Sequence, residues 1–250
     1  MKCRYLATGF RSAAWNMGLD EAVLRHVSEG ASPATLRFYG WKPRAVSIGY
    51  FQSLEEEVDV GECKGRGVDV VRRITGGGAV YHDKELTYSY IAPADTVPDD
   101  ILESYRLICG GLIEGFRLLG VEAEFAPLND IVAGGRKISG NAQTRRMNCV
   151  LQHGTILLDV DVKEMFALLK VPSEKMRDKL IAGAAERVTS LKHVLNREVP
   201  FNKAAGAFKS GFALALGLEL EDGGAGEGEL ELAGELAEGK YSTLEWNGRR

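Results

Sequence analysis

The chain has 250 residues, of which 45% are hydrophobic, and a formal net charge of −4. This length and composition allow a substantial core, and no apolar run approaches the roughly 18 to 20 residues that would cross a bilayer. The four cysteines have neither CxxC nor metal-ligand spacing, which argues against a disulfide framework and a zinc site. A cytoplasmic globular protein without a membrane span is therefore expected.

The net charge is unevenly distributed along the chain. Residues 218–238 hold eight acidic side chains and no Lys or Arg, and the rest of the chain has 27 acidic against 31 basic residues. An excess of about four positive charges suits an acidic protein partner or an anionic small molecule. It does not suit nucleic acid, for which clustered basic stripes are expected.

The first half of the chain predicts one helix followed by several strands. Hydrophobic residues recur at helical spacing over 16–28, and Asn16 is available as the N-cap. A glycine-rich loop follows the third of the expected strands. Alternating or continuous hydrophobic patterns predict these strands near 36–39, 46–50, 68–72 and 86–90.

The second half predicts a long amphipathic helix over 99–119, stopped by Gly120, and further strands within 121–158. The acidic segment 218–238 is low in complexity and is expected to be a mobile loop or a weak helix. Strands and helices do not alternate strictly, so we expect one α+β domain over 1–250 with a mixed, largely antiparallel sheet flanked by helices. Shorter helical patterns cover 161–170, 174–183 and 202–216.

The stretch VRRITGGGAVYHD, residues 71–83, places two arginines before three consecutive glycines. Glycine lets backbone amides approach an anion closely, and arginine offers a planar fork for carboxylate or phosphate. A hairpin turn beside a surface arginine pair explains the same pattern. The spacings of a Walker A loop and of a Rossmann loop are absent.

A second stretch, LNDIVAGGRKISGNAQ at 128–143, carries Lys137 between small residues, with Asn129 and Asp130 before it. A lysine in this setting can hold a substrate carboxylate and a phosphate while they react. The alternative is a solvated lysine on a hairpin, which is the commoner situation for lysines.

Together the two stretches resemble the lipoate-protein ligase and lipoyl-transferase family, in which an RRxTGGGAVYHD-like loop and a G[RK]K[IL]xGxA segment define the active site. This sequence matches them at 72–83 and 135–142. Two motifs in the right order make chance agreement improbable. The resemblance also covers the segments at 128–131, 152–159, 171–179, 187–191 and 241–247.

The resemblance implies a fold shared with biotin ligases and class II aminoacyl-tRNA synthetases. It also implies a lipoate-protein ligase that uses ATP and Mg²⁺ to form lipoyl-AMP and then acylates a carrier lysine. Lys137 would be catalytic, and Asn129 and Asp130 would lie near the adenylate, with Asp130 at the magnesium ion. The acyl-adenylate would be held by Arg73 and by the loop of Gly76, Gly77, Gly78, Ala79, Val80 and Tyr81, with His82 beside it.

The alternative is ATP-independent octanoyl or lipoyl transfer through a cysteine thioester. Family members of this type carry their cysteine just before the lysine segment or beyond the following strands, where this chain has EAEFAPLND and LKVPSEKM. Cys149 lies closer to Lys137 but within a strand pattern, where a thiol is usually inert. His82 and His153 are expected to make structural hydrogen bonds, because no GxSxG motif accompanies them.

The resemblance also implies partners. They are lipoyl carrier domains, such as the E2 subunits of 2-oxoacid dehydrogenases and the H protein of glycine cleavage. Full-length ligases of the family continue beyond the YSTLEWN-like segment into an accessory domain, and because this sequence stops three residues after that segment, we expect the two-component form. A separate accessory-domain protein is therefore an expected partner.

Overall fold

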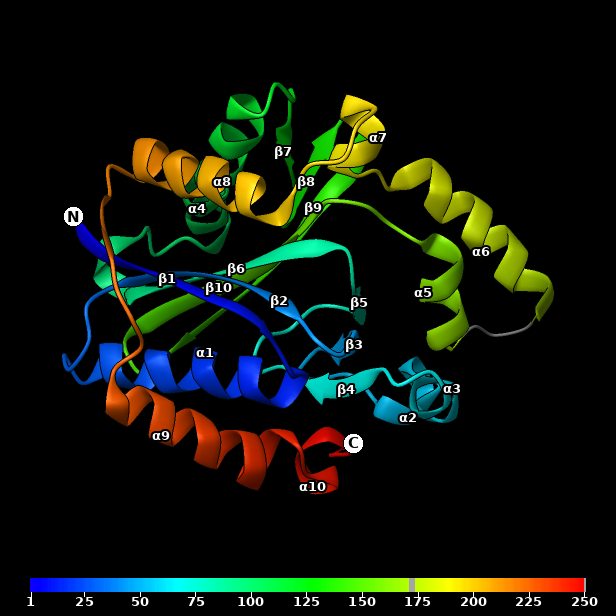
Figure 1. Ribbon diagram of the computed structural model, residues 1–250, viewed down its shortest axis with the longest axis horizontal. Helices are drawn as coiled ribbons and strands as arrows, with labels where there is room; N and C mark the ends of the chain where they lie inside the picture. The colour runs from blue at the N-terminus through cyan, green and yellow to red at the C-terminus, as the bar shows by residue number, and fades with distance from the viewer. Residues whose placement is uncertain (171–173, 250) are drawn as a thin grey trace.

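The computed structural model describes residues 1–170 and 174–249. Its centre is an eight-stranded sheet (Figure 1) in the order β11-β1-β2-β6-β10-β9-β8-β7. A smaller sheet has the order β4-β3-β5. The large sheet consists of β11 (Glu219–Asp222), β1 (Lys2–Arg11), β2 (Thr35–Trp41), β6 (Glu85–Pro93), β10 (Cys149–Leu157), β9 (Arg136–Arg146), β8 (Asp130–Ala133) and β7 (Glu124–Ala126).

The large sheet combines both strand orientations. Strand β1 pairs in parallel with β11 and β2, whereas the pairs from β2 through β6, β10, β9 and β8 to β7 are antiparallel. The expected α+β class with a mixed, largely antiparallel sheet is thus confirmed. Strand β1 was not predicted, because its burial does not alternate regularly between buried and exposed residues.

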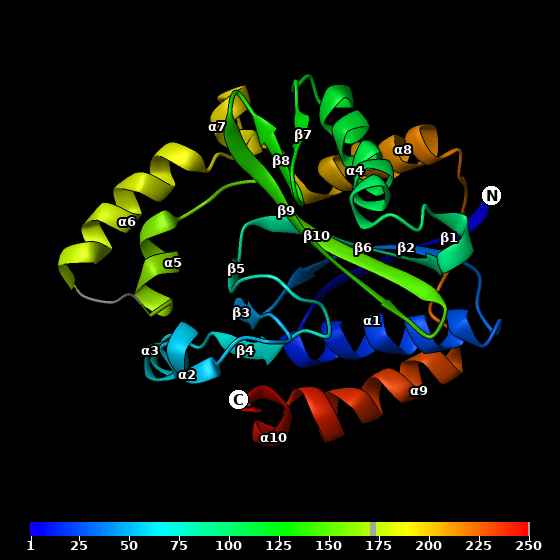
Figure 2. The same cartoon turned by 180° about the vertical axis from the view of Figure 1, so that it is seen from behind.

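Two helices, α4 (Ile101–Leu118) and α8 (Phe201–Leu216), cover one face of this sheet (Figure 2). Glycines bring them close together. A Cβ at Gly211 would lie 2.4 Å from the backbone nitrogen of Gly115, and a Cβ at Gly115 would lie 2.2 Å from the ring of Phe208. The rings of Phe208 and Phe212 fill the resulting space and are fully buried.

The opposite face carries α1 (Ala13–Ser28) and α9 (Glu227–Leu236), which pack against each other. Helix α1 starts earlier than predicted, because Ser12 and not Asn16 accepts the cap hydrogen bond. Asn16 is buried inside the helix, where its amide donates to the carbonyls of Arg11 and Gly40. The prediction of Asn16 as the cap was therefore wrong.

The acidic segment 218–238 contains strand β11 and helix α9 instead of a mobile loop. Glu229 explains much of this order, because its carboxylate lies 2.6 Å from the guanidinium of Arg4 and also accepts from Ser32. Helix α9 does form, which agrees with the second of the two expectations for this segment, a weak helix. Strand β11 was missed because low complexity hid its pairing with β1.

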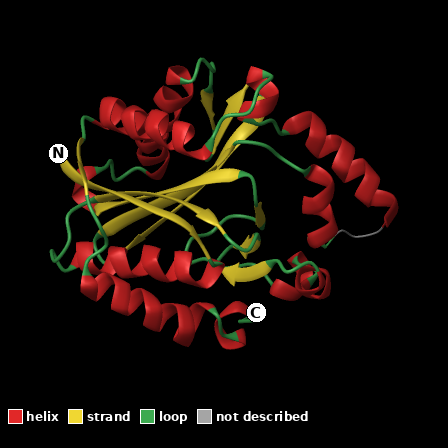
Figure 3. Cartoon of the chain, viewed as in Figure 1, coloured by secondary structure: helices red, strands yellow, loops and turns green. Residues whose placement is uncertain are grey.

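The small sheet lies toward one end of the molecule, next to several of the remaining helices (Figure 3). The sheet consists of β4 (Asp69–Arg72), β3 (Ala45–Ile48) and β5 (Val80–His82), with α2 (Leu54–Glu57) and α3 (Val60–Gly65) beside it. A short 3-10 turn covers Ala94–Thr96 and a π-turn covers Ala237–Tyr241. The other helices are α5 (Val162–Leu168), α6 (Glu174–Arg187), α7 (Leu191–Leu195) and α10 (Leu244–Asn247).

Helix α6 includes most of the segment 171–179 that contributes to the family resemblance. The first three residues of that segment, 171–173, lie outside the described residues.

Candidate active site

The glycine-rich loop connects β4 to β5 and is packed against the end of β3. Gly77 has a positive φ of 93°, which a residue with a side chain adopts only with strain. A Cβ at Gly49, just after β3, would lie 2.0 Å from the carbonyl oxygen of Gly77. The loop backbone therefore depends on glycine at both positions.

Arg73 lies underneath this loop, and its guanidinium forms hydrogen bonds with groups of the protein itself. Its guanidinium donates to the carbonyl and Oγ of Ser47, at 2.9 and 2.7 Å, and to the carbonyls of Gly76 and Gly78, at 2.9 and 3.0 Å. Burial lowers the pKa of Arg73 to about 10, which leaves the side chain protonated at neutral pH. In these contacts Arg73 holds the shape of the loop.

Arg72 fixes the loop from its other side. Its guanidinium donates to the carbonyls of Gly49 and Gln52 and to those of Trp246 and Asn247. The backbone nitrogen of Arg72 also donates to the side chain of Asn247, at 2.7 Å. The segment around α10 is thereby joined to the strand that carries the loop.

Lys137 lies at the start of β9, across the pocket from the glycine loop. Its Nζ is 2.7 Å from Oδ1 of Asp130, and the two side chains are 42% and 33% exposed. A Cβ at Gly140 would lie 2.8 Å from both Nζ and Cε of Lys137, so this glycine leaves room for the lysine. Asn129 and Asn141 join the two strands beside it through mutual side-chain to backbone hydrogen bonds.

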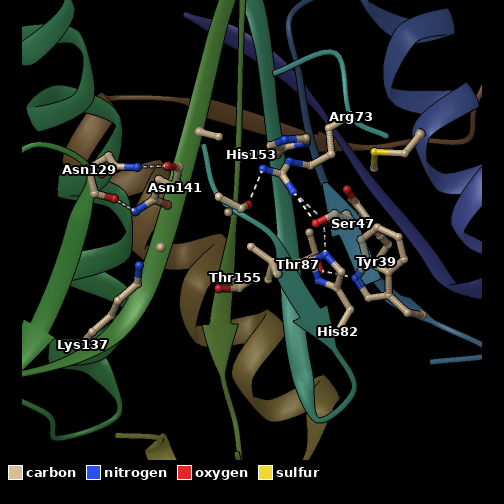
Figure 4. Close-up of a pocket in the computed structure, with 17 residues that line it drawn as sticks. Tyr39, Ser47, Arg73, His82, Thr87, Asn129, Lys137, Asn141, His153 and Thr155 are labelled. Atoms are coloured by element: carbon tan, nitrogen blue, oxygen red, sulfur yellow. Dashed lines mark hydrogen bonds between the residues drawn. The ribbon is translucent and has the colours of Figure 1, made fainter. Parts of the chain in front are cut away.

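These elements surround a pocket that encloses about 520 Å³ of empty space, including the part open to solvent. In Figure 4, Lys137, Asn129 and Asn141 lie on one side and Tyr39, Ser47 and His82 on the other. The lining residues are Met17, Tyr39, Trp41, Ser47, Arg73, Gly78, Val80, His82, Thr87, Asn129, Lys137, Gly140, Asn141, Ala142, His153, Gly154 and Thr155.

Six of the site residues expected from the sequence line this pocket: Arg73, Gly78, Val80, His82, Asn129 and Lys137. Asp130 stands behind Lys137 as its ionic partner. Gly76 and Gly77 belong to the loop without lining the pocket, Ala79 packs in a separate hydrophobic cluster, and Tyr81 lines another cavity beside Asp83.

Two buried hydroxyl–imidazole–carboxylate chains flank the pocket. In the first, Ser47 Oγ lies 2.6 Å from His82 Nε2, and His82 Nδ1 lies 2.7 Å from Glu85 Oε1. Because Arg73 donates to Ser47, the serine hydroxyl can donate to Nε2 and leave the proton on Nδ1 for Glu85. His82 also stacks on Trp41, with ring centroids 4.0 Å apart.

In the second chain, Thr75 Oγ1 lies 2.7 Å from His153 Nε2, and Asp20 Oδ2 lies 3.4 Å from His153 Nδ1. Burial lowers the pKa of His153 although Asp20 opposes this shift, so the imidazole is neutral at neutral pH. Both histidines make the structural hydrogen bonds that the sequence indicated. The partner of His82 is Glu85 and not its neighbour Asp83.

The four cysteines of the chain all lie within the described residues, and none of them lines the pocket. Burial raises the pKa of Cys3 and Cys109 to about 12 and that of Cys63 to about 11. Burial also raises the pKa of Cys149, the first residue of β10. Little thiolate is therefore present at neutral pH.

Residues 1–170 and 174–249 contain neither a metal-binding cluster nor a membrane-spanning helix. These residues contain no group of three or more His, Cys, Asp or Glu side chains placed to hold a metal ion. No helix among them is long and apolar enough to cross a membrane.

Comparison with known proteins identifies relatives over nearly the whole chain. The family model for the lipoyl protein ligase A/B catalytic domain matches residues 12–213. Octanoyltransferase LipM of Brevibacillus brevis is 40% identical over 272 aligned positions, which cover 99% of this chain and 99% of the relative. LipM of Bacillus subtilis is 37% identical, with 99% and 98% covered. Because this chain has 250 residues, at least 22 positions of the alignment with the Brevibacillus brevis protein pair a residue of that protein with a gap in this chain.

Two lipoate ligases are among the solved structures with a similar fold. A bi-partite lipoate protein ligase from Thermoplasma acidophilum, described with its E2 lipoyl domain, superimposes with a TM-score of 0.91 at 35% identity. The match covers 99% of this chain and 96% of that one. A lipoate-protein ligase A bound with ATP gives 0.86 at 34% identity, with 99% of both chains covered.

Proposed function

The chain belongs to the lipoyl protein ligase A/B catalytic domain family, and on this premise we propose that it attaches a lipoyl or octanoyl group to a lysine of a lipoyl carrier domain. The observation that carries the proposal is the pocket between the glycine loop and Lys137. It has one ammonium group at the β8–β9 side and aromatic and aliphatic groups at the other.

The pocket suits a slim substrate with a carboxyl head. The carbonyl carbon of the activated acyl group lies near Lys137, whose charge stabilises the oxyanion that develops when an amine attacks, before AMP or the donor's thiol leaves. The acyl chain extends toward Met17 and Trp41. Asp130 keeps the ammonium in place, and the carrier lysine supplies the attacking amine, so the reaction needs no nucleophile from the enzyme.

There are two candidate routes to the activated acyl group, transfer from an octanoylated donor and activation of the free acid by ATP. The names of the sequence relatives favour octanoyl transfer, so the ATP-dependent ligase expected from the sequence is not confirmed. The comparisons support the alternative, an octanoyltransferase, better.

A specific observation keeps ATP-dependent ligation as the second candidate. Transfer through an enzyme thioester needs a reactive thiol, and no cysteine of this chain lines the pocket. Just before Lys137, strands β7 and β8 are separated by only residues 127–129, and this connection contains no cysteine. We therefore propose that the carrier lysine attacks the activated carboxyl directly, whichever donor supplies it.

The residues present also fit the cosubstrate of a ligase. Mg²⁺ in nucleotide sites is usually held by one or two carboxylates together with substrate phosphates, and it neutralises phosphate charge there. Asp130, beside Lys137, is the carboxylate in position to contribute. Arg73 and the loop of Gly76, Gly77, Gly78, Ala79, Val80 and Tyr81, with His82 and Asn129, remain our proposed contacts for the nucleotide and acyl group.

The partners follow from the same chemistry. The Thermoplasma ligase was described with its E2 lipoyl domain and as bi-partite, which supports our proposal of a lipoyl domain as acceptor and of a separate accessory protein. The E2 subunits of 2-oxoacid dehydrogenases and the glycine cleavage H protein are the acceptors to test. A cytoplasmic location stays a prediction.

One experiment tests the function and separates the donors. The purified protein is incubated with apo lipoyl domain and either lipoate, ATP and Mg²⁺ or an octanoylated acyl carrier protein, and the mass of the lipoyl domain is followed. Acylation only with ATP assigns the ligase, and acylation only from the octanoyl carrier assigns the transferase. The proposal predicts that neither reaction leaves a hydroxylamine-sensitive acyl group on the enzyme. Absence of acylation in both arms, with the proposed accessory protein also present, would refute it.

A further inference from the structure

A group of aromatic and basic side chains lies on the surface next to the glycine loop. We call Tyr50, Phe51, Arg146, Trp246 and Arg249 the Tyr50 patch. The Tyr50 ring meets those of Phe51 and Trp246, with centroids 4.9 and 6.0 Å apart. The guanidinium carbons of Arg146 and Arg249 each lie 4.8 Å from the Tyr50 ring. Phe51 is 68% exposed.

The two arginines of the patch differ from other arginines of the chain in lacking an acidic partner among residues 1–170 and 174–249. No described carboxylate lies within 4.0 Å of Arg146 or Arg249, whereas ion pairs are formed by Arg4, Arg37, Arg44, Arg66 and Arg117. Hydrogen bonding to Arg146 and the charge of Arg249 lower the pKa of Tyr50, which reports the positive potential there. Both guanidiniums lie over the half-buried Tyr50 ring, and one nitrogen of Arg249 also donates to the Tyr50 hydroxyl at 3.0 Å. Each guanidinium has five N–H groups, so these contacts leave N–H groups available to carboxylates from outside.

The patch is rigidly connected to the active site. The backbone nitrogen of Tyr50 donates to the carbonyl of Thr75 at 2.8 Å, immediately before the glycine loop. Arg72 binds the carbonyls of Tyr50 and Trp246 and so joins the two parts of the patch. Arg146 lies on the same face of β9 as Ala142, which lines the pocket four residues away, or about 13 Å along the strand.

We propose that the Tyr50 patch is the docking surface for an acidic face of the carrier domain whose lysine is acylated. This inference rests on the proposed function, because the reaction requires a protein acceptor to sit beside the pocket while its lysine enters. Tyr, Trp and Arg are the residues most enriched in the energetic centres of protein interfaces. Outside 218–238 the chain also has an excess of basic residues, which suits an acidic partner.

Charge reversal tests the surface. Arg146→Glu and Arg249→Glu are made singly and together. Arg197→Glu is the matched control, because Arg197 is exposed like Arg249 and forms no ion pair among the described residues. Binding of apo lipoyl domain is measured by titrating the ¹⁵N-labelled domain, and acylation kinetics are measured at several salt concentrations. Thermal melting checks that each variant is folded.

We expect the double variant to raise both the Kd and the KM for the lipoyl domain by at least about tenfold, with kcat and acyl-substrate binding nearly unchanged. Its KM should also lose most of the salt dependence of the unaltered protein. Phe51→Ala should raise the Kd without changing that salt dependence. Arg197→Glu should behave like the unaltered protein.

An unchanged Kd and KM in the folded double variant would overturn the proposal and leave the patch to another partner, such as an accessory protein. The same holds if Arg197→Glu weakens the carrier as much as the double variant does. Binding of the apo domain needs no acyl donor. Patch-dependent binding without any acylation would therefore point to failure of the proposed function and not of the docking surface.

Discussion

At the scale of single residues, Lys137 depends on a neighbour with no side chain. A Cβ at Gly140 would meet Cε and Nζ of Lys137 at 2.8 Å, and a flexible side-chain end is what moves most easily under such a clash. Gly140→Ala should therefore displace the ammonium from Asp130 without unfolding the protein.

We expect Gly140→Ala to lower kcat for acylation on the order of 10- to 100-fold and Lys137→Ala to lower it further, with melting temperatures close to that of the unaltered protein. Steady-state kinetics with the lipoyl domain measure both. Gly134→Ala is not a suitable control, because Gly134 has a positive φ of 55°. Gly65→Ala is a better one, since Gly65 ends helix α3 away from the proposed site and a Cβ there meets nothing within 4 Å. Full activity of Lys137→Ala would remove this lysine from the mechanism.

Cys149 gives a second test at this scale. It is the cysteine closest in sequence to Lys137, but it is buried and burial raises its pKa. Cys149→Ala should therefore retain at least about half of the acylation rate with the favoured donor, because no thioester forms on it. Loss of activity, together with a trapped acyl-enzyme seen by mass spectrometry, would instead establish a covalent route.

The candidate site was predictable from the sequence only where it is continuous. The glycine loop and the stretch around Lys137 are short, and their residue types alone indicate that they bind an anionic group. Ser47 and Thr75 are different, because they meet His82 and His153 from 35 and 78 positions away. A hydroxyl becomes informative only when the fold brings it to an imidazole. Thr75 lies within the glycine-loop motif, but its contact with His153 cannot be read from it, and nothing local in the sequence marks Ser47.

At the scale of elements, the well-predicted parts have a strong hydrophobic period. Helix α4 is of this kind, and its predicted range of 99–119 agrees with the observed Ile101–Leu118 to within two residues at each end. Strands β1 and β11 were missed because they pair at an edge of the sheet, where long-range pairing and not local pattern determines the structure. The predicted start of α1 was wrong because Asn16 does not cap the helix. Its side chain instead accepts a hydrogen bond from Arg37 and binds backbone groups inside the core.

The packing of α4 on α8 gives a prediction about stability. A Cβ at Gly211 would lie 2.4 Å from the backbone nitrogen of Gly115, and backbone cannot move aside cheaply. Gly211→Ala should lower the free energy of unfolding by about 1–3 kcal/mol, as overpacking does. Gly206→Ala is the matched control in the same helix, because its Cβ would meet nothing within 4 Å.

Urea unfolding distinguishes the two variants of α8. Gly206→Ala should gain about 0.5–1 kcal/mol, because alanine favours a helix over glycine. Equal stability changes of the same sign in both variants would show that the helices do not pack as closely as described.

At the scale of the whole molecule, buried carboxylates make the protein sensitive to acid. Burial alone would raise the pKa values of Asp20 and Glu229, but Arg37 and Arg4 outweigh it, so both pKa values are lowered. A lowered native pKa contributes stability that is complete above the ordinary carboxyl value of about 4 and is lost as the pH falls toward the native value.

The free energy of unfolding, measured with urea from pH 6 to pH 3, should therefore decrease steeply below about pH 4. Glu229→Gln should lower stability at pH 6 and flatten this decrease. Glu227 is exposed at the start of the same helix and has no resolved ion pair among the described residues, so Glu227→Gln should leave the curve nearly unchanged. A pH profile unaffected by Glu229→Gln would assign the acid sensitivity to other groups.

The hydrogen bonds of Arg72 have a consequence for how the protein is made. Arg72 lies at the entrance to the glycine loop, and the carbonyl it binds at Trp246 belongs to a residue 174 positions later in the chain. On the ribosome, the loop-bearing strand is synthesised long before the residues that complete its contacts. The glycine loop can therefore take its final shape only after translation has passed Asn247, so nascent chains carry both motifs of the site without yet having a finished pocket.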